Sequence, residues 1–183
     1  MKRECGQRLG GKSRRKFVAI EESKFAHKRK YNHGLFDPLG KEKKGWVFGM
    51  TEVKGARRQP VLKMVRDRSR NTLMPLMRKH IRRGSTVYSD CWRAYQPALN
   101  VEGYRRLSVN HRERFVDPLT GRHTQHIERA WQTIKHQVSR YRGNKTSKLL
   151  KDHLRFIQWD YWLGRRHSKG SFAQLIHDIK KSI

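Results

Sequence analysis

The stretch Phe17-Val18-Ala19-Ile20-Glu21-Glu22-Ser23 decides the fold of this chain. Its apolar body is continuous rather than alternating, which is typical of a strand buried on both faces. A strand of this kind lies inside a sheet that is covered by helices. We therefore expect a central strand over residues 17–23, with Glu21 near its end.

The elements predicted after this strand alternate between strands and helices. Strands are expected over residues 46–53, 60–65, 85–89 and 105–110. Helices are expected from Asn71 or Thr72 (as N-cap) to Arg83, from about 124 to 141, from about 147 to 163 and from 172 to 179. A short helix carrying Trp92 and Tyr95 is expected after Asp90. This order predicts one mixed sheet with helices packed on it, an α/β fold.

The domain organisation predicted from length and composition is simple. A chain of 183 residues suits one well-buried domain. Residues 1–16 are basic and contain glycine, so we expect a flexible lead-in there. We expect residues 17–145 to form the main α/β domain, and residues 146–183 to form a helical C-terminal extension packed on the same domain.

Charge limits the class of partner. Lys and Arg number 44 against 15 Asp and Glu, a formal net charge of +29. This excess indicates a polyanionic partner, most simply nucleic acid. The sequence contains no apolar run near the ~18 residues of a spanning helix, so we expect no membrane insertion. Cys5 and Cys91 are the only cysteines, which indicates reduced thiols in an intracellular protein and excludes a cysteine zinc finger in this chain.

Three acids lie where an α/β fold could bring them together. Glu21 is near the end of the first strand, and Asp90 directly follows the strand over residues 85–89. If these two strands are parallel neighbours, their carboxylates meet at one edge of the sheet. Glu128 borders the apolar stripe of the helix from about residue 124, and Lys135, seven residues later, shares its face. Each acid alone reads as a surface charge, but together they predict a divalent metal site.

Several blocks of the sequence, in the same order, resemble a known family. They are 19–25, 45–49, 84–92, 109–111, 115–118, 121–124, and Ile127-Glu128 followed by Trp131 and Lys135. Together they resemble the DDE-type transposase domain of bacterial insertion sequences and of their eukaryotic Merlin relatives, which is similar to ribonuclease H in fold. The resemblance runs from about Gly10 to Trp162.

The resemblance implies a ribonuclease-H-like fold and metal-dependent DNA cleavage and strand transfer. It implies two Mg²⁺ (or Mn²⁺) ions held by acids at Glu21, Asp90 and Glu128, with Lys135 holding the DNA end. The implied partner is double-stranded DNA, both transposon ends and target, bound by a homodimer or larger assembly. The expected location is where the DNA is: the nucleus in a eukaryote, the cytoplasm in a bacterium.

One departure from the family falls on a site residue. The family typically has Asp where this chain has Glu21, and the extra methylene changes the reach of a metal ligand. We therefore expect impaired catalysis. Two alternatives stay open: a domesticated or decayed non-catalytic DNA-binding protein that keeps the fold, and a basic RNA-associated protein whose acids are incidental.

Overall fold

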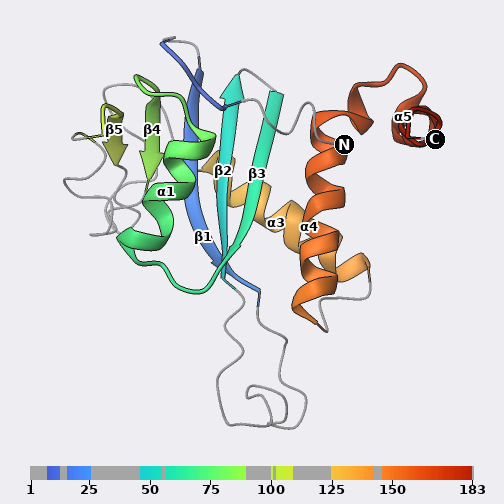
Figure 1. The fold of residues 1–183 in the computed structure, drawn as a ribbon, viewed down its shortest axis with the longest axis horizontal. Coiled ribbons are helices and arrows are strands. Elements are labelled where there is room, and N and C mark those ends of the chain that lie inside the picture. The colour runs from blue at the N-terminus through green and yellow to red at the C-terminus, as the bar shows by residue number, and fades with distance from the viewer. Residues whose placement is uncertain are drawn as a thin grey trace, which may run out of the picture.

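The computed structural model describes residues 8–12, 16–25, 46–54, 57–89, 100, 102–108, 125–141 and 146–182. Its centre is a five-stranded mixed sheet in the order β3-β2-β1-β4-β5 (Figure 1). The strands are β1 (Lys16–Lys24), β2 (Trp46–Lys54), β3 (Arg57–Val65), β4 (Thr86–Ser89) and β5 (Arg105–Ser108). The predicted α/β fold and all five predicted strands are confirmed, with shifts of a few residues at their ends.

The strand directions decide which predicted site residues can meet. β1 pairs antiparallel with β2, and β2 pairs antiparallel with β3. On its other edge β1 pairs parallel with β4, which in turn pairs parallel with β5. The first and fourth strands are therefore parallel neighbours, as the clustering of the acids requires.

Helices cover both faces of this sheet. They are α1 (Arg70–His80), α3 (Gln125–Arg140), α4 (Ser147–Trp162) and α5 (Gly170–Lys180), with a short 3-10 helix η2 (Gly164–Arg166) before α5. α1 lies on one face and α3 on the other, while α5 lies at the far end of the molecule (Figure 1). In the described part of the chain, no helix is both long and apolar enough to cross a membrane.

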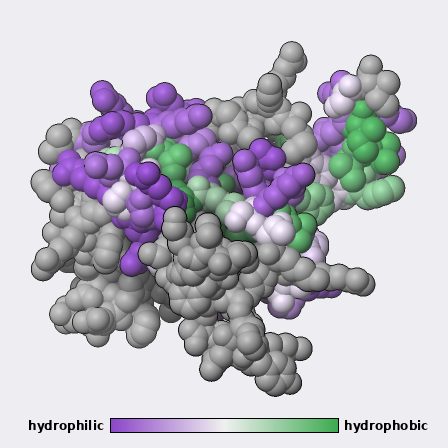
Figure 2. Space-filling view, turned by 60° about the horizontal axis from the view of Figure 1, so that its bottom comes forward, coloured by the Kyte–Doolittle hydropathy of each residue, from purple (hydrophilic) through white to green (hydrophobic). Residues whose placement is uncertain are grey.

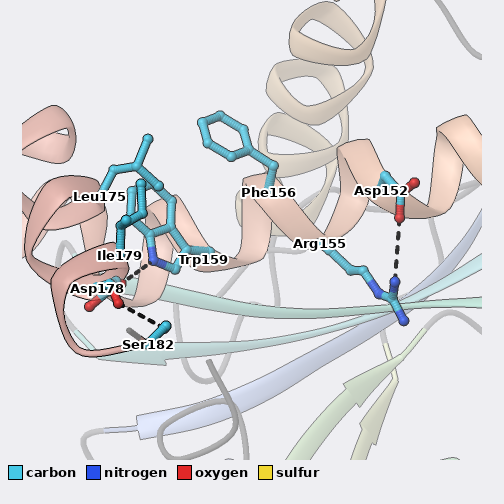
Figure 3. Close-up of a pocket in the computed structure, with 8 residues that line it drawn as sticks. All are labelled: Asp152, Arg155, Phe156, Trp159, Leu175, Asp178, Ile179 and Ser182. Carbon is cyan, nitrogen blue, oxygen red and sulfur yellow. Dashed lines mark hydrogen bonds and ion pairs between the residues drawn. The ribbon is translucent and has the colours of Figure 1, made fainter.

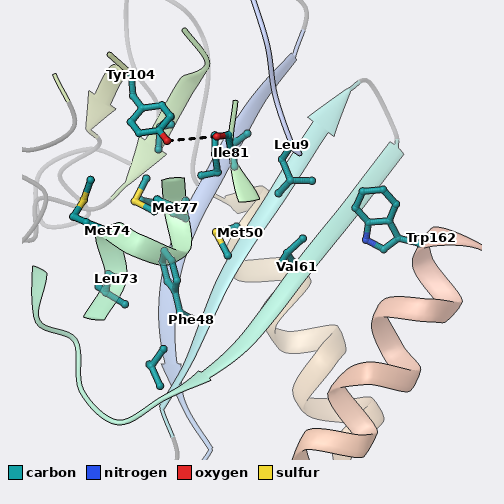
Figure 4. Close-up of a cluster of buried hydrophobic side chains, with 14 residues drawn as sticks. Leu9, Phe48, Met50, Val61, Leu73, Met74, Met77, Ile81, Tyr104 and Trp162 are labelled. Carbon is teal, nitrogen blue, oxygen red and sulfur yellow. Dashed lines mark hydrogen bonds between the residues drawn. The ribbon is translucent and has the colours of Figure 1, made fainter. Parts of the chain in front are cut away.

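The apolar body of β1 divides between two cores. Val18 and Ile20 belong to the cluster on the α1 face, where α1 contributes Leu73 and Met77 (Figure 4). Ala19, between them, belongs to the cluster on the α3 face. Because successive side chains of a strand point to opposite faces, β1 is buried on both sides, as its sequence predicts.

The N-cap of α1 differs from the prediction. Ser69, rather than Asn71 or Thr72, caps the helix, and its Oγ accepts a hydrogen bond from the Thr72 amide at 3.3 Å. Asp67 Oδ1 in turn accepts from the Ser69 amide at 2.9 Å and the Thr72 hydroxyl at 2.7 Å. These bonds hold the pKa of Asp67 well below its usual range. A second polar side chain fixes the cap position, so residue identity at 71 and 72 was an insufficient guide.

The helix also ends earlier than predicted, at His80 rather than Arg83, because Ile81 adopts an extended conformation and pairs with Leu9. The Leu9 amide donates to the His80 carbonyl at 2.7 Å, and the Arg82 amide donates to the Leu9 carbonyl at 2.9 Å. Leu9 is only 1% exposed. Part of the predicted flexible lead-in is therefore fixed in the core; residues 1–7 and 13–15 lie outside the described residues.

α4 covers the outer edge of the sheet. The amide of Leu62, on edge strand β3, donates to Gln158 Oε1 at 2.8 Å, and Trp162 Nε1 donates to the Pro60 carbonyl at 2.8 Å. Side chains of α4 thus form hydrogen bonds with backbone groups of β3 that an edge strand leaves unpaired. The start of the C-terminal segment packs on the sheet, while the predicted domain boundaries at 16 and 145 stay predictions.

His80 predicts a pH dependence of stability. Burial, followed by the charges of Lys63 and Lys79, lowers the pKa of His80 from 6.5 to about 4. Between these values the unfolded chain binds the proton more readily than the folded chain, so stability falls as pH drops from about 6.5 towards 4. We expect the urea midpoint of His80→Gln to fall less than that of the wild type across this window. His177→Gln, at an exposed histidine of α5, is the control and should follow the wild type.

Candidate catalytic carboxylate site

Glu21 is the predicted site residue that the structure describes most fully. It is partly buried, and its Oε2 atom is shielded from solvent. Two residues after Ala19, it shares the α3 face of β1, whereas Glu22 points to the α1 face. Glu21 therefore presents its carboxylate on the side of the sheet that α3 covers.

A glycine beside Glu21 seats a tryptophan from α3. Gly49 on β2 is the register partner of Glu21. A β-carbon at Gly49 would lie 2.9 Å from Cη2 of Trp131 and closer still to Cζ2, so the indole rests directly on the glycine backbone. Trp131 is 5% exposed. This close approach fixes α3 over the stretch of β1 that carries Glu21.

Lys135 lies near the end of the same strand. Phe25 follows β1, and its ring meets that of Trp131 edge-on at 6.0 Å between centroids. The Lys135 Nζ atom lies 6.0 Å from the centroid of the Phe25 ring, at the outer range of a cation–π contact. Lys135 is exposed. The ammonium group of Lys135 thus lies beside the carboxyl end of β1, where it can reach a ligand at that edge of the sheet.

The other two predicted acids are described less fully. Asp90 lies outside the described residues, directly after Ser89, the last residue of β4. Glu128 belongs to α3, one turn before Trp131 and two turns before Lys135, and its side chain also lies outside the described part. The convergence of the three carboxylates therefore stays a prediction, as does the short helix expected after Asp90.

The sequence matches a known family along most of its length. The model of the ISXO2-like transposase domain matches residues 12–159. The chain belongs to this family. The resemblance stated from the sequence blocks is thereby confirmed, and the protein is derived from a DNA transposase. A comparison with curated proteins finds no match to this transposase chain.

Solved structures show the same fold as this transposase chain. The catalytic core domain of BIV integrase has a TM-score of 0.51 at 10% identity, over 91% of this chain and 98% of that one. An intasome chain of simian T-cell lymphotropic virus, solved in complex with the PP2A regulatory subunit B56 gamma, gives 0.49 at 11% identity, over 88% of this chain. This chain spans about half, 52%, of that intasome chain. The ribonuclease-H-like fold class is confirmed.

The donor chemistry at the site fits a hard divalent cation. Within the described ranges, no three His, Cys, Asp or Glu side chains lie close enough together to hold a metal ion. Of the three acids, only Glu21 has a described side chain, and carboxylate oxygen is the ligand type that Mg²⁺ prefers. The partly buried carboxylate of Glu21 is therefore a ligand type that suits such a cation.

Sequence reasoning missed the contact between Gly49 and Trp131. A glycine inside a strand often marks a place where another group approaches the backbone closely, so Gly49 carried a usable signal. The strand register was also needed, because only the pairing of Gly49 with Glu21 shows that the approach occurs beside the candidate site.

Gly49→Ala should destabilise the transposase domain by about 1–3 kcal/mol, the usual cost of overpacking a core. The new methyl overlaps the Trp131 ring, which has nowhere to move. Chemical denaturation of the wild type and variant measures the loss. Combining Gly49→Ala with Trp131→Leu should cost less than the two single changes added together, because the smaller side chain removes the overlap. Simple additivity would contradict the proposed contact.

Proposed function

We propose that this chain cleaves and joins DNA using two Mg²⁺ (or Mn²⁺) ions held by Glu21, Asp90 and Glu128. The parallel register of β1 and β4 carries the proposal. Val18 pairs with Val87 and Ala19 with Tyr88. If this register continues for two more residues along both strands, position 90 lies beside Glu21. Tyr88, like Ala19, belongs to the core on the α3 face, so alternation favours that same face for position 90.

The packing of α3 supports the third ligand. Trp131 fixes the helix on Gly49, next to Glu21. Position 128 is one turn earlier on the same helix, and position 135 lies nearly two full turns after it, on the same face. Lys135 lies beside Phe25 at the end of β1, and the proposal expects position 128, on the same face of α3, to supply the third ligand. Both observations favour an acidic site under the first two turns of α3.

Each residue has a separate role in the proposed chemistry. Bound ions in a site of this kind activate the attacking oxygen and stabilise the leaving oxygen of an in-line displacement at phosphorus. Glu21 belongs to β1 and Asp90 directly follows β4 in the sequence, so in this proposal the sheet sets the separation of the two carboxylates. Glu128 closes the site from the helix. Lys135, exposed and cationic, contacts a phosphate of the DNA end.

The metal dependence of DNA nicking tests this proposal. We expect the purified chain to nick supercoiled DNA, or the ends of its own element, with Mg²⁺ or Mn²⁺ and not with EDTA. Ca²⁺ serves as a control, because it accepts oxygen ligands but prefers longer distances and a looser geometry. Cleavage that persists in EDTA would overturn the assignment of a metal-dependent site.

A second function is favoured by Glu21 itself. Glutamate reaches one methylene further than the aspartate that the family typically has, and two ions ~3.5–4 Å apart constrain that reach. A chain that keeps the fold and charge but not the chemistry would be a non-catalytic DNA-binding protein. In that case DNA binding is retained while no metal supports nicking.

The proposed partner is double-stranded DNA, at transposon ends and at the target. The net charge of +29 supports it. Assembly as a homodimer or larger complex on DNA, and residence wherever that DNA is, belong to the same proposal. Size measurement of the protein–DNA complex tests the assembly.

A further inference from the structure

The exposed apolar side chains of the described chain gather in one region. Among the residues that the structure describes, every large hydrophobic side chain with substantial exposure lies between positions 141 and 179. Four belong to α5: Phe172 at 76%, Leu175 at 37%, Ile176 at 39% and Ile179 at 47%. Figure 2 shows this hydrophobic patch at the end of the molecule that α5 forms. An apolar patch so concentrated on a highly charged protein marks an interaction surface.

A groove lies between α4 and α5 within this region (Figure 3). Its volume is about 490 Å³, and Phe156, Trp159, Leu175 and Ile179 supply its apolar walls. The Phe156 and Trp159 rings stack at 5.4 Å between centroids. Trp159 Nε1 donates to Asp178 Oδ2 at 2.8 Å, which ties α5 to α4. The groove is therefore held open by a fixed contact between its two helices.

α5 has the pattern of a helix that binds in a groove. Phe172, Leu175, Ile176 and Ile179 follow the i, i+3, i+4, i+7 spacing of the anchors on such helices. Leu175 and Ile179 line the chain's own groove, while Phe172 and Ile176 do not. No residue of α5 is buried. Each copy therefore offers both a groove and two free anchors, which is the requirement for a self-complementary contact.

Charge distinguishes between possible occupants. Asp152 and Asp178 line the groove with a single cation, Arg155, on a chain whose overall charge is +29. The hydrogen bond from Trp159 lowers the pKa of Asp178, so its carboxylate stays charged. A groove with an acidic excess disfavours nucleic acid and favours a basic amphipathic helix. Within α5 Lys180 is balanced by Asp178, but Lys181 follows directly, so the C-terminal end of this amphipathic helix is its basic part.

We propose that the α4–α5 groove binds α5 of a second copy of this chain, in a two-fold symmetric contact. Phe172 and Ile176 of each copy fill the groove of the other, and the lysines at the end of α5 approach the acidic lining. The contact is made by the free protein and depends on neither the carboxylate site nor DNA.

Sedimentation equilibrium of the DNA-free protein tests the proposal. We expect a concentration-dependent dimer, weakened at least about a hundredfold by Phe172→Gln with Ile176→Gln, since each lost anchor costs about tenfold or more. Gln keeps helix propensity, and far-ultraviolet circular dichroism verifies that α5 remains folded. Leu149→Gln is the matched control, because Leu149 is 36% exposed but lies outside the groove; it should dimerise like the wild type.

Two further results separate this proposal from its rivals. Salt screens both the net repulsion between two like-charged chains and the attraction between the α5 lysines and the acidic lining, so the dimer should change little with salt, whereas DNA binding should weaken strongly. Asp152→Lys should weaken the dimer without reducing DNA affinity. A wild-type protein that stays monomeric at high concentration and high salt would overturn the proposal. The same holds if the protein stays monomeric and its groove instead binds a basic peptide from another protein. A dimer unaffected by the Phe172 and Ile176 changes would overturn it equally.

Discussion

Asp90→Asn and Glu128→Gln are each expected to reduce Mg²⁺-dependent nicking by at least about a hundredfold. Each change removes the charge of a proposed oxygen ligand while keeping the size of the side chain. Loss of a ligand weakens stabilisation of the transition state by several kcal/mol, and each 1.36 kcal/mol corresponds to a factor of ten in rate. Initial rates on supercoiled DNA measure the effect. Neither change should alter the fold, because charge is removed without a change of volume.

Glu21→Asp is expected to act in the opposite direction and raise nicking. It shortens the ligand by one methylene at constant charge, so DNA affinity should scarcely change. Glu22→Gln is the matched control: Glu22 is the adjacent acid, but it pairs with Phe48 and faces α1. It should nick like the wild type.

Three other outcomes decide between the proposals. If Glu21→Asp restores no activity to a chain that binds DNA, the non-catalytic DNA-binding function is supported. If the wild type is fully active and Glu21→Asp harms it, then Glu21 is an adapted ligand and the expectation of impaired catalysis is wrong. Loss of activity in Glu22→Gln would transfer the first ligand to Glu22 and contradict the face argument.

Much of the sheet could be predicted because its strands carry their own signals. Val18, Ala19 and Ile20 are apolar in succession, and this pattern only makes sense for a strand covered on both faces. The apolar stripe of α3 likewise predicts which face of the helix is buried. Trp131, Ile134 and Val138 are buried, as this periodicity predicts. Patterns of this kind lie within one element and need no knowledge of its neighbours.

The missed features depend on contacts with other residues, some distant in the chain and some near. Leu9 is a lone apolar residue in a basic segment, and its burial comes from pairing with Ile81. The same pairing ends α1 early. Ser69 was not predicted as the cap because its position is fixed by Asp67. Local propensity cannot identify such partners, since each residue on its own is compatible with a loop.

The elements that carry the candidate residues could be predicted, whereas the packing between these elements could not. Glu21, placed at the end of a strand, and Lys135, placed on a helix face, follow from period and spacing alone. The seat that brings their elements together, Trp131 on Gly49, requires the register of β1 with β2. The candidate residues can be found from a sequence pattern, whereas the contact between Trp131 and Gly49 is visible only in the folded chain.

Raising salt from about 50 to about 200 mM should weaken binding to double-stranded DNA by about a thousandfold or more. A protein that makes 6–10 phosphate contacts loses this much affinity, because each contact releases a counterion when it forms. With 44 basic residues the chain has cations in excess of that number. Fluorescence anisotropy on labelled duplexes of different sequence measures the effect. Because phosphate contacts carry no sequence information, we expect similar affinities for these duplexes.

Lys135 provides the local form of the same prediction. Lys135→Gln removes one proposed phosphate contact, so the slope of log affinity against log salt should become shallower by about one. Arg155→Gln is the matched control, because Arg155 is also an exposed cation of a helix but pairs with Asp152 at 3.3 Å beside the α4–α5 groove. Its slope should equal that of the wild type. Equal reductions for both variants would mean that DNA senses only total charge, and Lys135 would then lose its assigned place at the DNA end.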